Sequence, residues 1–139
     1  MALVRLYGAR DLVPITLTGG NSQGGDLRLF GIDDPLVQKE QGAVTSSRAR
    51  LTGLDVEPAP ALGFAGAAAV DMRGVFVGMI DFKPAIVAAN DGSSHTRATL
   101  VPVEPIRAFL KAHNVSPTIA PNSPAEAEQS VVRITCVRK

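Results

Sequence analysis

The residues of this chain that could do chemistry are few and scattered. His95 directly follows Ser93 and Ser94, which places an imidazole next to two hydroxyl groups. Nucleophilic catalysis needs a base within hydrogen-bond reach of the nucleophile, and adjacent residues rarely align for that proton transfer. A polar turn explains this cluster more simply. The second histidine, His113, is expected to end a helix, so we predict solvated or capping roles for both histidines.

Metal binding and a nucleic-acid partner are both disfavoured. The single cysteine, Cys136, has no histidine or second thiol at a spacing typical of metal ligands, and we expect it to be a small buried residue of a strand. We therefore expect no metal and no other cofactor. With 14 basic and 13 acidic residues, the chain carries a formal net charge of +1, which argues against nucleic acid. Arg48 and Arg50 alternate with Ser46, a pattern typical of an exposed strand face.

The pattern along the chain is that of an all-β protein. Thirteen glycines and ten prolines separate short β-branched runs. These runs predict strands at residues 2–7, 14–18, 26–32, 43–51, 67–70, 75–82, 86–89 and 96–103. One amphipathic helix is predicted over residues 104–113, because Pro105 suits a first turn and Ile106, Phe109 and Leu110 share a face. No apolar run approaches the roughly 18 residues of a membrane span, so we expect no membrane insertion.

The C-terminal part is predicted to be separate. Residues 115–129 begin with a stretch rich in proline, serine and asparagine and are expected to form a linker. Residues 130–139 form an apolar run that predicts a terminal strand, which must find a sheet edge in the same molecule or in a neighbour. The predicted organisation is a barrel over residues 1–114, a linker over 115–129 and a strand over 130–139.

The order of several short motifs resembles a known family. They are Met1-Ala2-Leu3-Val4-Arg5-Leu6, Gly25-Asp26-Leu27-Arg28-Leu29-Phe30-Gly31, Gly63-Phe64-Ala65-Gly66-Ala67-Ala68 and Val75-Phe76-Val77-Gly78-Met79-Ile80, followed by the helix. In this order, residues 1–114 resemble the C-terminal β-barrel of trypsin-like serine proteases, especially the disulfide-poor bacterial branch that includes the high-temperature-requirement proteases. The resemblance implies an antiparallel Greek-key barrel of six or seven strands, with one late helix; the terminal strand is additional.

The same resemblance implies that the catalytic machinery is missing. Ala65 stands at the position of the nucleophilic serine, and its methyl group cannot attack a carbonyl. Met1 stands at the aspartate position, and the family's histidine lies in a first barrel that this sequence does not include. In the family, the amides of the nucleophile and of the glycine two residues earlier bind the oxyanion. Gly63 and Ala65 would supply these amides here, as a vestigial oxyanion hole that could still bind a carboxylate or a peptide carbonyl.

Alternatives remain at this turn and for the whole chain. The acidic residue after the first glycine is replaced by Phe64, and Ala67 replaces the second loop glycine, so residues 65–69 are also consistent with a plain small-residue turn leading into a buried strand. Our first functional hypothesis is a non-catalytic, protease-like domain that binds a peptide or protein partner. A fragment of a trypsin-like endopeptidase, with histidine and aspartate upstream, is the enzymatic alternative, and an unrelated small β-barrel is the third.

The resemblance also guides the expected partner. The surface that faces the first barrel in the family is apolar, and an apolar surface seeks cover. We therefore predict a homodimer, formed through that surface or by exchange of strand 130–138. The family's habit suggests a periplasmic or other extracytoplasmic location.

Overall fold

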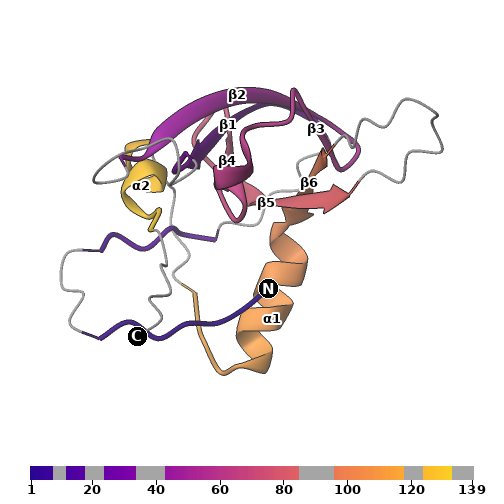
Figure 1. Ribbon diagram of the computed structural model, residues 1–139. Helices are drawn as coiled ribbons and strands as arrows, with labels where there is room; N and C mark the ends of the chain where they lie inside the picture. Colours follow the sequence, from indigo (N-terminus) through magenta and orange to yellow (C-terminus); the bar gives the residue numbers. More distant parts are fainter. Residues whose placement is uncertain (8–11, 18–23, 34–42, 85–95, 118–123, 133–139) are drawn as a thin grey trace, which may run out of the picture.

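The computed structural model of the protein describes residues 1–7, 12–17, 24–33, 43–84, 96–117 and 124–132. Within these residues the chain forms six strands, two α-helices and a short 3-10 helix (Figure 1). The strands are β1 (Gly25–Gly31), β2 (Thr45–Thr52), β3 (Asp55–Glu57), β4 (Ala68–Asp71), β5 (Phe76–Pro84) and β6 (Thr96–Pro102). The helices are η1 (Leu62–Phe64), α1 (Val103–Ala112) and α2 (Pro124–Gln129).

The strands close into a barrel in the order β1-β2-β3-β6-β5-β4, and each neighbouring pair is antiparallel. The fourth strand lies beside the first, in the order β4-β1-β2-β3, which is the Greek-key arrangement. The barrel closes where β1 pairs with β4, from Leu27 opposite Asp71 to Phe30 opposite Ala68. The predicted all-β, antiparallel Greek-key barrel with a short helix is confirmed.

The barrel interior follows from the alternation of side chains along the strands. β1 turns Leu27 and Leu29 inward, and β2 does the same with Ala49 and Leu51. The intervening residues of each strand, such as Arg28 and Arg50, therefore face outward. The interior is completed by buried residues of the other elements: Val56, Phe64, Ala67, Ala69, Val77, Ile80, Ala98 and Leu100.

Strand β5 is buried on both faces, as its apolar run predicts. Val77 and Ile80 belong to the barrel interior, whereas Phe76 packs outside the barrel against α1. The pairing of β4 with β5 shifts register between Ala69 and Val70, which indicates a β-bulge. Gly78 is required there, because a Cβ atom at this position would collide with the carbonyl oxygen of Val101.

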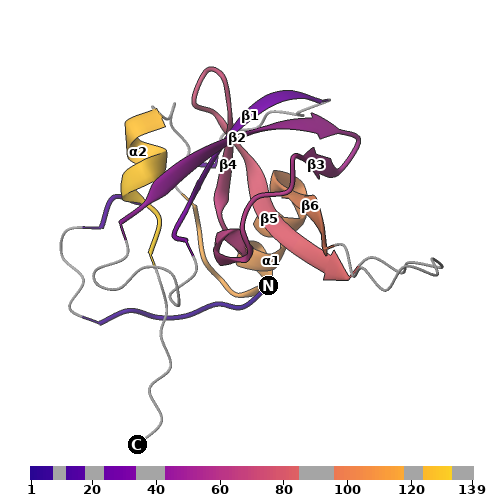
Figure 2. The same cartoon turned by 45° about the horizontal axis from the view of Figure 1, so that its top comes forward.

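The two helices cover different parts of the outer barrel surface (Figures 1 and 2). Helix α1 continues directly from β6 and buries Val103 and Ile106 against Phe76 and Leu17. Helix α2 buries Ala127 against Phe30 and Val70 on the outer side of β1 and β4. The outer face at the start of β1 and the end of β2 therefore stays free of both helices.

The junction of β3 with β6 is the narrowest in the barrel. It has a single register pair, Asp55 opposite Thr99. The amide of Leu100 donates to the carbonyl oxygen of Leu54 at 2.8 Å, and Arg97 pairs with Asp55, with 2.6 Å between Arg97 Nε and Asp55 Oδ1. This hydrogen bond from Arg97 lowers the pKa of Asp55. An exposed charged pair thus adds to the short backbone pairing.

Two of the predicted N-terminal strands are absent. Residues 1–7 form no strand and are exposed, and residues 14–17 form none either, although Leu17 is buried. The physical reason is the closure of the barrel: β1 and β4 pair with each other, which leaves no open edge for a further strand. Strand β3, in contrast, is present in the structure but is not predicted from the sequence, because its three residues are too few to show an alternating pattern. Strand 86–89 lies outside the described residues.

The C-terminal prediction also needs correction in its described part. Helix α2 occupies residues 124–129 of the expected linker, and its Ala127 is completely buried. Residues 130–132 form no strand. Val131 instead packs against the apolar clusters on the outer barrel surface. Residues 133–139, which include Cys136, Arg133, Arg138 and Lys139, lie outside the described residues.

Candidate functional site

The turn that precedes β4 contains the position of the expected nucleophile. Ala65 has φ −58° and ψ 120°, and Gly66 follows with φ +80°. The amide of Ala67 donates to the carbonyl oxygen of Phe64 at 2.9 Å. These values describe a type II turn, which needs a positive φ at its third residue and therefore favours glycine there. The sequence prediction of a tight bend leading into a buried strand agrees with this geometry.

Phe64 fixes the turn to the barrel. Its side chain is only 3% exposed and belongs to the interior cluster. It lies directly against Gly31 of β1, where a Cβ atom would come within 2.6 Å of Phe64 Cδ1. The large ring thus requires a glycine opposite it. At the position where the resemblance expects an acidic side chain, this protein uses an apolar anchor.

The far side of the turn is fixed to β5. The amide of Gly66 donates to the carbonyl oxygen of Ile80 at 2.8 Å, and the amide of Ile80 donates to Ala67 at 3.0 Å. Ala65 lies between these anchors with its methyl group exposed. A side chain at residue 65 therefore projects from a well-supported turn, and here that side chain has no hydroxyl.

The expected two-amide oxyanion site does not form in this geometry. The amide of Ala65 donates to the carbonyl oxygen of Leu62 at 3.1 Å, within the 3-10 turn of η1. An oxyanion hole needs its donors directed at one external point. Since the Ala65 amide is already used inside the turn, Gly63 and Ala65 do not provide a converging pair. The sequence could not reveal this, because one 3-10 hydrogen bond decides where the amide points.

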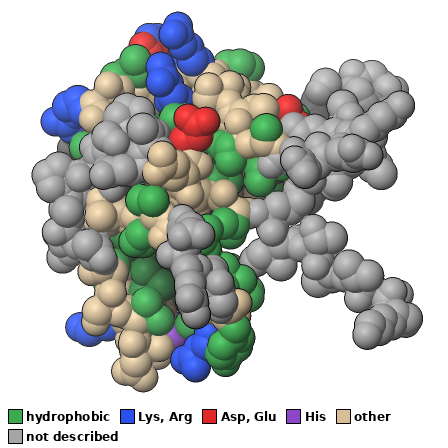
Figure 3. Space-filling model, turned by 90° about the vertical axis from the view of Figure 1, so that its left-hand side faces the viewer, with side chains coloured by type: hydrophobic (Ala, Val, Ile, Leu, Met, Phe, Trp, Pro, Cys, Tyr) green, Lys and Arg blue, Asp and Glu red, His purple; other side chains and the backbone are tan. Residues whose placement is uncertain are grey.

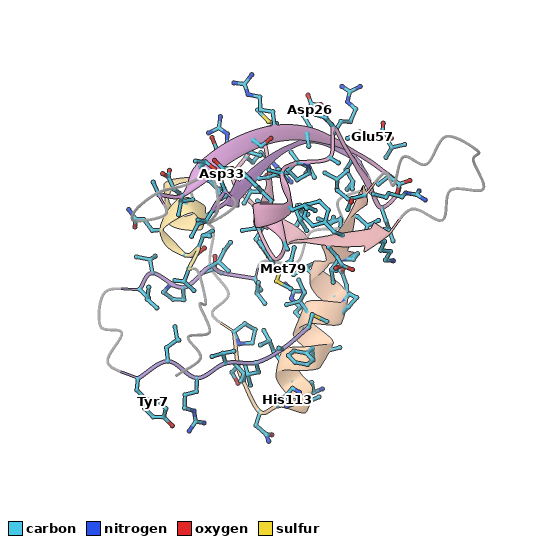
Figure 4. All side chains as sticks on the ribbon, viewed as in Figure 1. Tyr7, Asp26, Asp33, Glu57, Met79 and His113 are labelled. Carbon is cyan, nitrogen blue, oxygen red and sulfur yellow. The ribbon has the colours of Figure 1, made fainter. Side chains whose placement is uncertain are left out.

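No base accompanies Ala65 in the described part of the chain. His113 follows α1, its amide donates to Leu110 at 3.0 Å, and its ring contacts the edge of Phe109 with centroids 4.5 Å apart. This exposed position at the helix end fits the predicted capping role. Figure 4 places His113 at the far end of α1 from the barrel. His95, Ser93 and Ser94 lie outside the described residues.

A second group of polar residues lies on the outer face of β1 and β2. Arg48 and Arg50 are exposed, as predicted for a strand face. Arg50 Nε lies 3.1 Å from Asp26 Oδ1. A hollow of about 390 Å³ opens beside these residues and is also bordered by Arg28 and Met72. Figure 3 shows basic side chains gathered at the top of the molecule, with acidic ones among them.

The turn between β4 and β5 carries the clearest electrostatic feature. Asp71 Oδ1 accepts the amides of Arg73 and Val75, both at 2.9 Å, and Oδ2 accepts Arg73 Nε at 3.0 Å. Burial raises the pKa of Asp71, but these hydrogen bonds and the Arg73 charge outweigh it and hold the pKa below its ordinary value. This carboxylate stabilises the turn between β4 and β5.

Within the described ranges, no three histidine, cysteine, aspartate or glutamate side chains lie close enough together to hold a metal ion. The helices in those ranges are all too short or too polar to cross a membrane. Comparison with known proteins finds no matching family model, no matching curated protein and no matching solved structure. The resemblance to trypsin-like proteases therefore depends on the motifs of this chain and on the order of its elements.

Proposed function

We propose that this protein is a non-catalytic relative of the C-terminal barrel of trypsin-like serine proteases, and that it acts by binding protein, first of all a second copy of itself. The observation that carries the proposal is Ala65, an exposed methyl group on the turn that enters β4. The kinship is supported by a closed Greek-key barrel, a tight turn before β4 and a helix after the last strand, although the first motif, residues 1–6, forms no strand.

The chemistry of peptide cleavage supports the loss of catalysis. Acyl transfer needs a nucleophile, a base and a group that stabilises the oxyanion. Ala65 offers no nucleophile, and its amide is used by Leu62. Within the described residues, a restored hydroxyl would also lack a nearby base, because His113 lies at the end of α1. Binding is the activity that such a barrel retains.

The N-terminal segment, residues 1–7, is the surface that we expect to self-associate. Its large apolar side chains are about half exposed or more: Met1, Leu3, Val4, Leu6 and Tyr7. Within the described residues, its backbone makes no hydrogen bond to the barrel. Figures 1 and 2 show it starting beside α1, and Figure 4 shows Tyr7 at the opposite end of the molecule from Asp26 and Glu57. An extended apolar segment with unpaired amides is a strand without a partner.

A second copy of the same segment is the partner that fits best. The barrel is closed and offers no open edge, so an extended segment must find its backbone partner outside the barrel. Pairing of two identical segments satisfies both at once and gives a symmetric, self-complementary interface. An antiparallel pair centred on Val4 would place each Arg5 opposite a Leu3, which keeps the two arginines apart.

Sedimentation velocity over a range of concentrations tests self-association. We expect a dimer for the wild type and a monomer for the double variant Leu3→Glu, Leu6→Glu. The control is Leu54→Glu, which adds one charge at an exposed leucine on the β2–β3 turn and should leave the dimer intact. A wild-type protein that stays monomeric at the highest concentration would contradict the proposal.

Cross-linking tests the register of the pair. In a Cys136→Ser background, Val4→Cys should give a disulfide-linked dimer under mild oxidation, because directly opposite residues bring their Cβ atoms within about 4.5–5.5 Å. Leu54→Cys in the same background is the control and should stay uncross-linked. Equal cross-linking of both variants would show that the contact is not specific to the segment.

The enzymatic alternative keeps one supporting observation, the well-formed turn with an exposed residue 65. It predicts that Ala65→Ser reacts with a fluorophosphonate probe once a histidine is supplied by a longer protein. For the chain described here we expect no labelling of either the wild type or Ala65→Ser. Strong labelling of Ala65→Ser would mean that a base is present, and it would overturn the non-catalytic assignment.

A further inference from the structure

Two arginines face each other across β1 and β2, and neither forms an ion pair within the described residues. The strand register places Arg28 directly opposite Arg48, and like charges in directly opposite positions repel. An anionic group placed beside both side chains would relieve this repulsion.

The neighbouring residues on β1 and β4 do not supply that group. Asp26, the nearest carboxylate on β1, is engaged by Arg50 at 3.1 Å. On the other flank of Arg28, β4 presents Val70, which is completely buried. Across the described stretches of the chain, neither Arg28 nor Arg48 takes part in an ion pair.

Both arginines border the hollow of about 390 Å³ on this face. Its volume is at the small end of the range typical of ligand sites, roughly 300–1,000 Å³. Met72, which is 62% exposed, and Pro58 provide apolar surface beside the guanidinium groups. The hollow therefore combines two hydrogen-bonding cations with a place for aliphatic carbon.

The carboxylates at the same hollow restrict what can bind. Asp26 and Glu57 border it, so it holds three arginines against two acidic residues. A chain of phosphates would meet these carboxylates, and the net charge of the whole protein is only +1. A single carboxylate on an otherwise apolar segment carries less negative charge, so these two acidic residues repel it less than they repel a chain of phosphates. Planar guanidinium groups are also well matched to a carboxylate.

We propose that Arg28 and Arg48 bind the carboxylate side chain of an acidic peptide segment on a partner protein. The inference extends the proposed binding function by giving the chemistry of a partner, and it uses a surface far from residues 1–7. Figure 4 places Asp26 and Glu57 at one end of the molecule and Tyr7 at the other, so both surfaces can be occupied at once.

The test follows the arginine side-chain Nε–Hε signals by ¹H–¹⁵N NMR during titration with a peptide. The probe is the acetylated, amidated pentapeptide Ala-Leu-Glu-Leu-Ala, and its matched control has glutamine in place of glutamate. We expect the signals of Arg28 and Arg48 to shift with the glutamate peptide only. Equal shifts with both peptides would overturn the proposal, as would shifts with inorganic phosphate but not with the glutamate peptide.

Three variants then locate the site. Arg28→Gln and Arg48→Gln should each weaken binding of the glutamate peptide by about tenfold, since a hydrogen bond to a charged group is lost. Arg73→Gln, which removes an exposed arginine on the neighbouring turn, should weaken it less than twofold. An equal loss in all three variants would mean that only general charge matters, and it would overturn the assignment.

The double variant Leu3→Glu, Leu6→Glu separates this proposal from the previous one. It should bind the glutamate peptide as the wild type does, even as a monomer. If the wild type is monomeric and still binds the peptide, self-association alone is wrong. If the protein dimerises but the peptide does not bind, the carboxylate site alone is wrong.

Discussion

The inner and outer faces of β1 and β2 are built on the same two strands but have opposite characters. Inside, Leu27 and Leu29 meet Ala49 and Leu51 in a closed apolar core. Outside, at the same end of the strands, Arg28 stands opposite Arg48. An interior position must fit its neighbours closely to remain stable, whereas an exterior position is free to serve binding. Outward residues of these strands can therefore change with little effect on the fold.

The anchor of the turn before β4 gives the largest expected effect. Replacing Phe64 with alanine removes a buried ring and leaves a cavity next to Gly31, so Phe64→Ala should lower the free energy of unfolding by about 3–5 kcal/mol. Urea denaturation followed by circular dichroism measures it. Leu62→Ala, at an exposed leucine of the same turn, should change stability by less than about 0.5 kcal/mol. Equal losses of stability in the two variants would contradict the expected difference between buried and exposed residues of this turn.

We expect replacement of Asp71 to have an effect between those of Phe64→Ala and Leu62→Ala, because Asp71 is a charged residue whose hydrogen bonds support a turn. Replacing it with asparagine at pH 7 should cost about 1–2 kcal/mol, since charge-assisted hydrogen bonds are lost. Hydrogen bonding lowers the pKa of Asp71 from its ordinary value of 3.8. The ionised carboxylate therefore contributes stability above that value, and the contribution disappears as the pH falls through the lowered pKa.

The measurement is urea denaturation of the wild type and Asp71→Asn at several pH values between 7 and the acid limit. The difference between the two proteins should be largest at neutral pH and should shrink in acid. A difference that stays constant down to the lowest pH would show that the charge of Asp71 does not stabilise the turn.

Gly66 tests the turn without touching the core. Its φ of +80° disfavours any side chain, while a Cβ atom there would meet nothing within 4 Å. Gly66→Ala should therefore cost about 1 kcal/mol through backbone strain alone. Ala65→Ser, at the adjacent exposed residue, should change stability by less than about 0.5 kcal/mol. If Gly66→Ala is neutral, the turn is less rigid than its hydrogen bonds indicate.

Much of the barrel could be predicted from the sequence, because its strands alternate or are continuously apolar. Strand β1 shows its inward leucines directly, and the apolar run of β5 indicates burial on both faces. The bend at Ala65 was predicted through its small residues. The run at residues 2–7 predicts a strand that does not form, because an apolar extended sequence is the same whether or not a sheet edge is open to it.

The candidate sites were harder to predict for a related reason. The direction of the Ala65 amide depends on one hydrogen bond to Leu62, which no residue type encodes. The pairing of Arg28 with Arg48 depends on strand register, and these residues are 20 positions apart in the sequence. The alternation of Arg48 with Ser46 predicts only an exposed strand face. The signal in the sequence is Arg28, a second basic residue at an outward position of a predicted strand, which could have indicated a paired arginine site.

The smallest expected effect is at Arg48, and it is the sharpest test of the outer face. Arg48→Gln removes a repulsion with Arg28 and no ion pair, so stability should stay within about 0.5 kcal/mol of the wild type or rise slightly. Asp26→Asn is the matched control: it breaks the exposed pair with Arg50 and should cost up to about 1 kcal/mol. Urea denaturation at low and high salt measures both, and salt should reduce both differences because it screens exposed charges. A loss above about 1 kcal/mol for Arg48→Gln would mean that Arg48 has a structural partner, and the outer face would then serve the fold rather than a ligand.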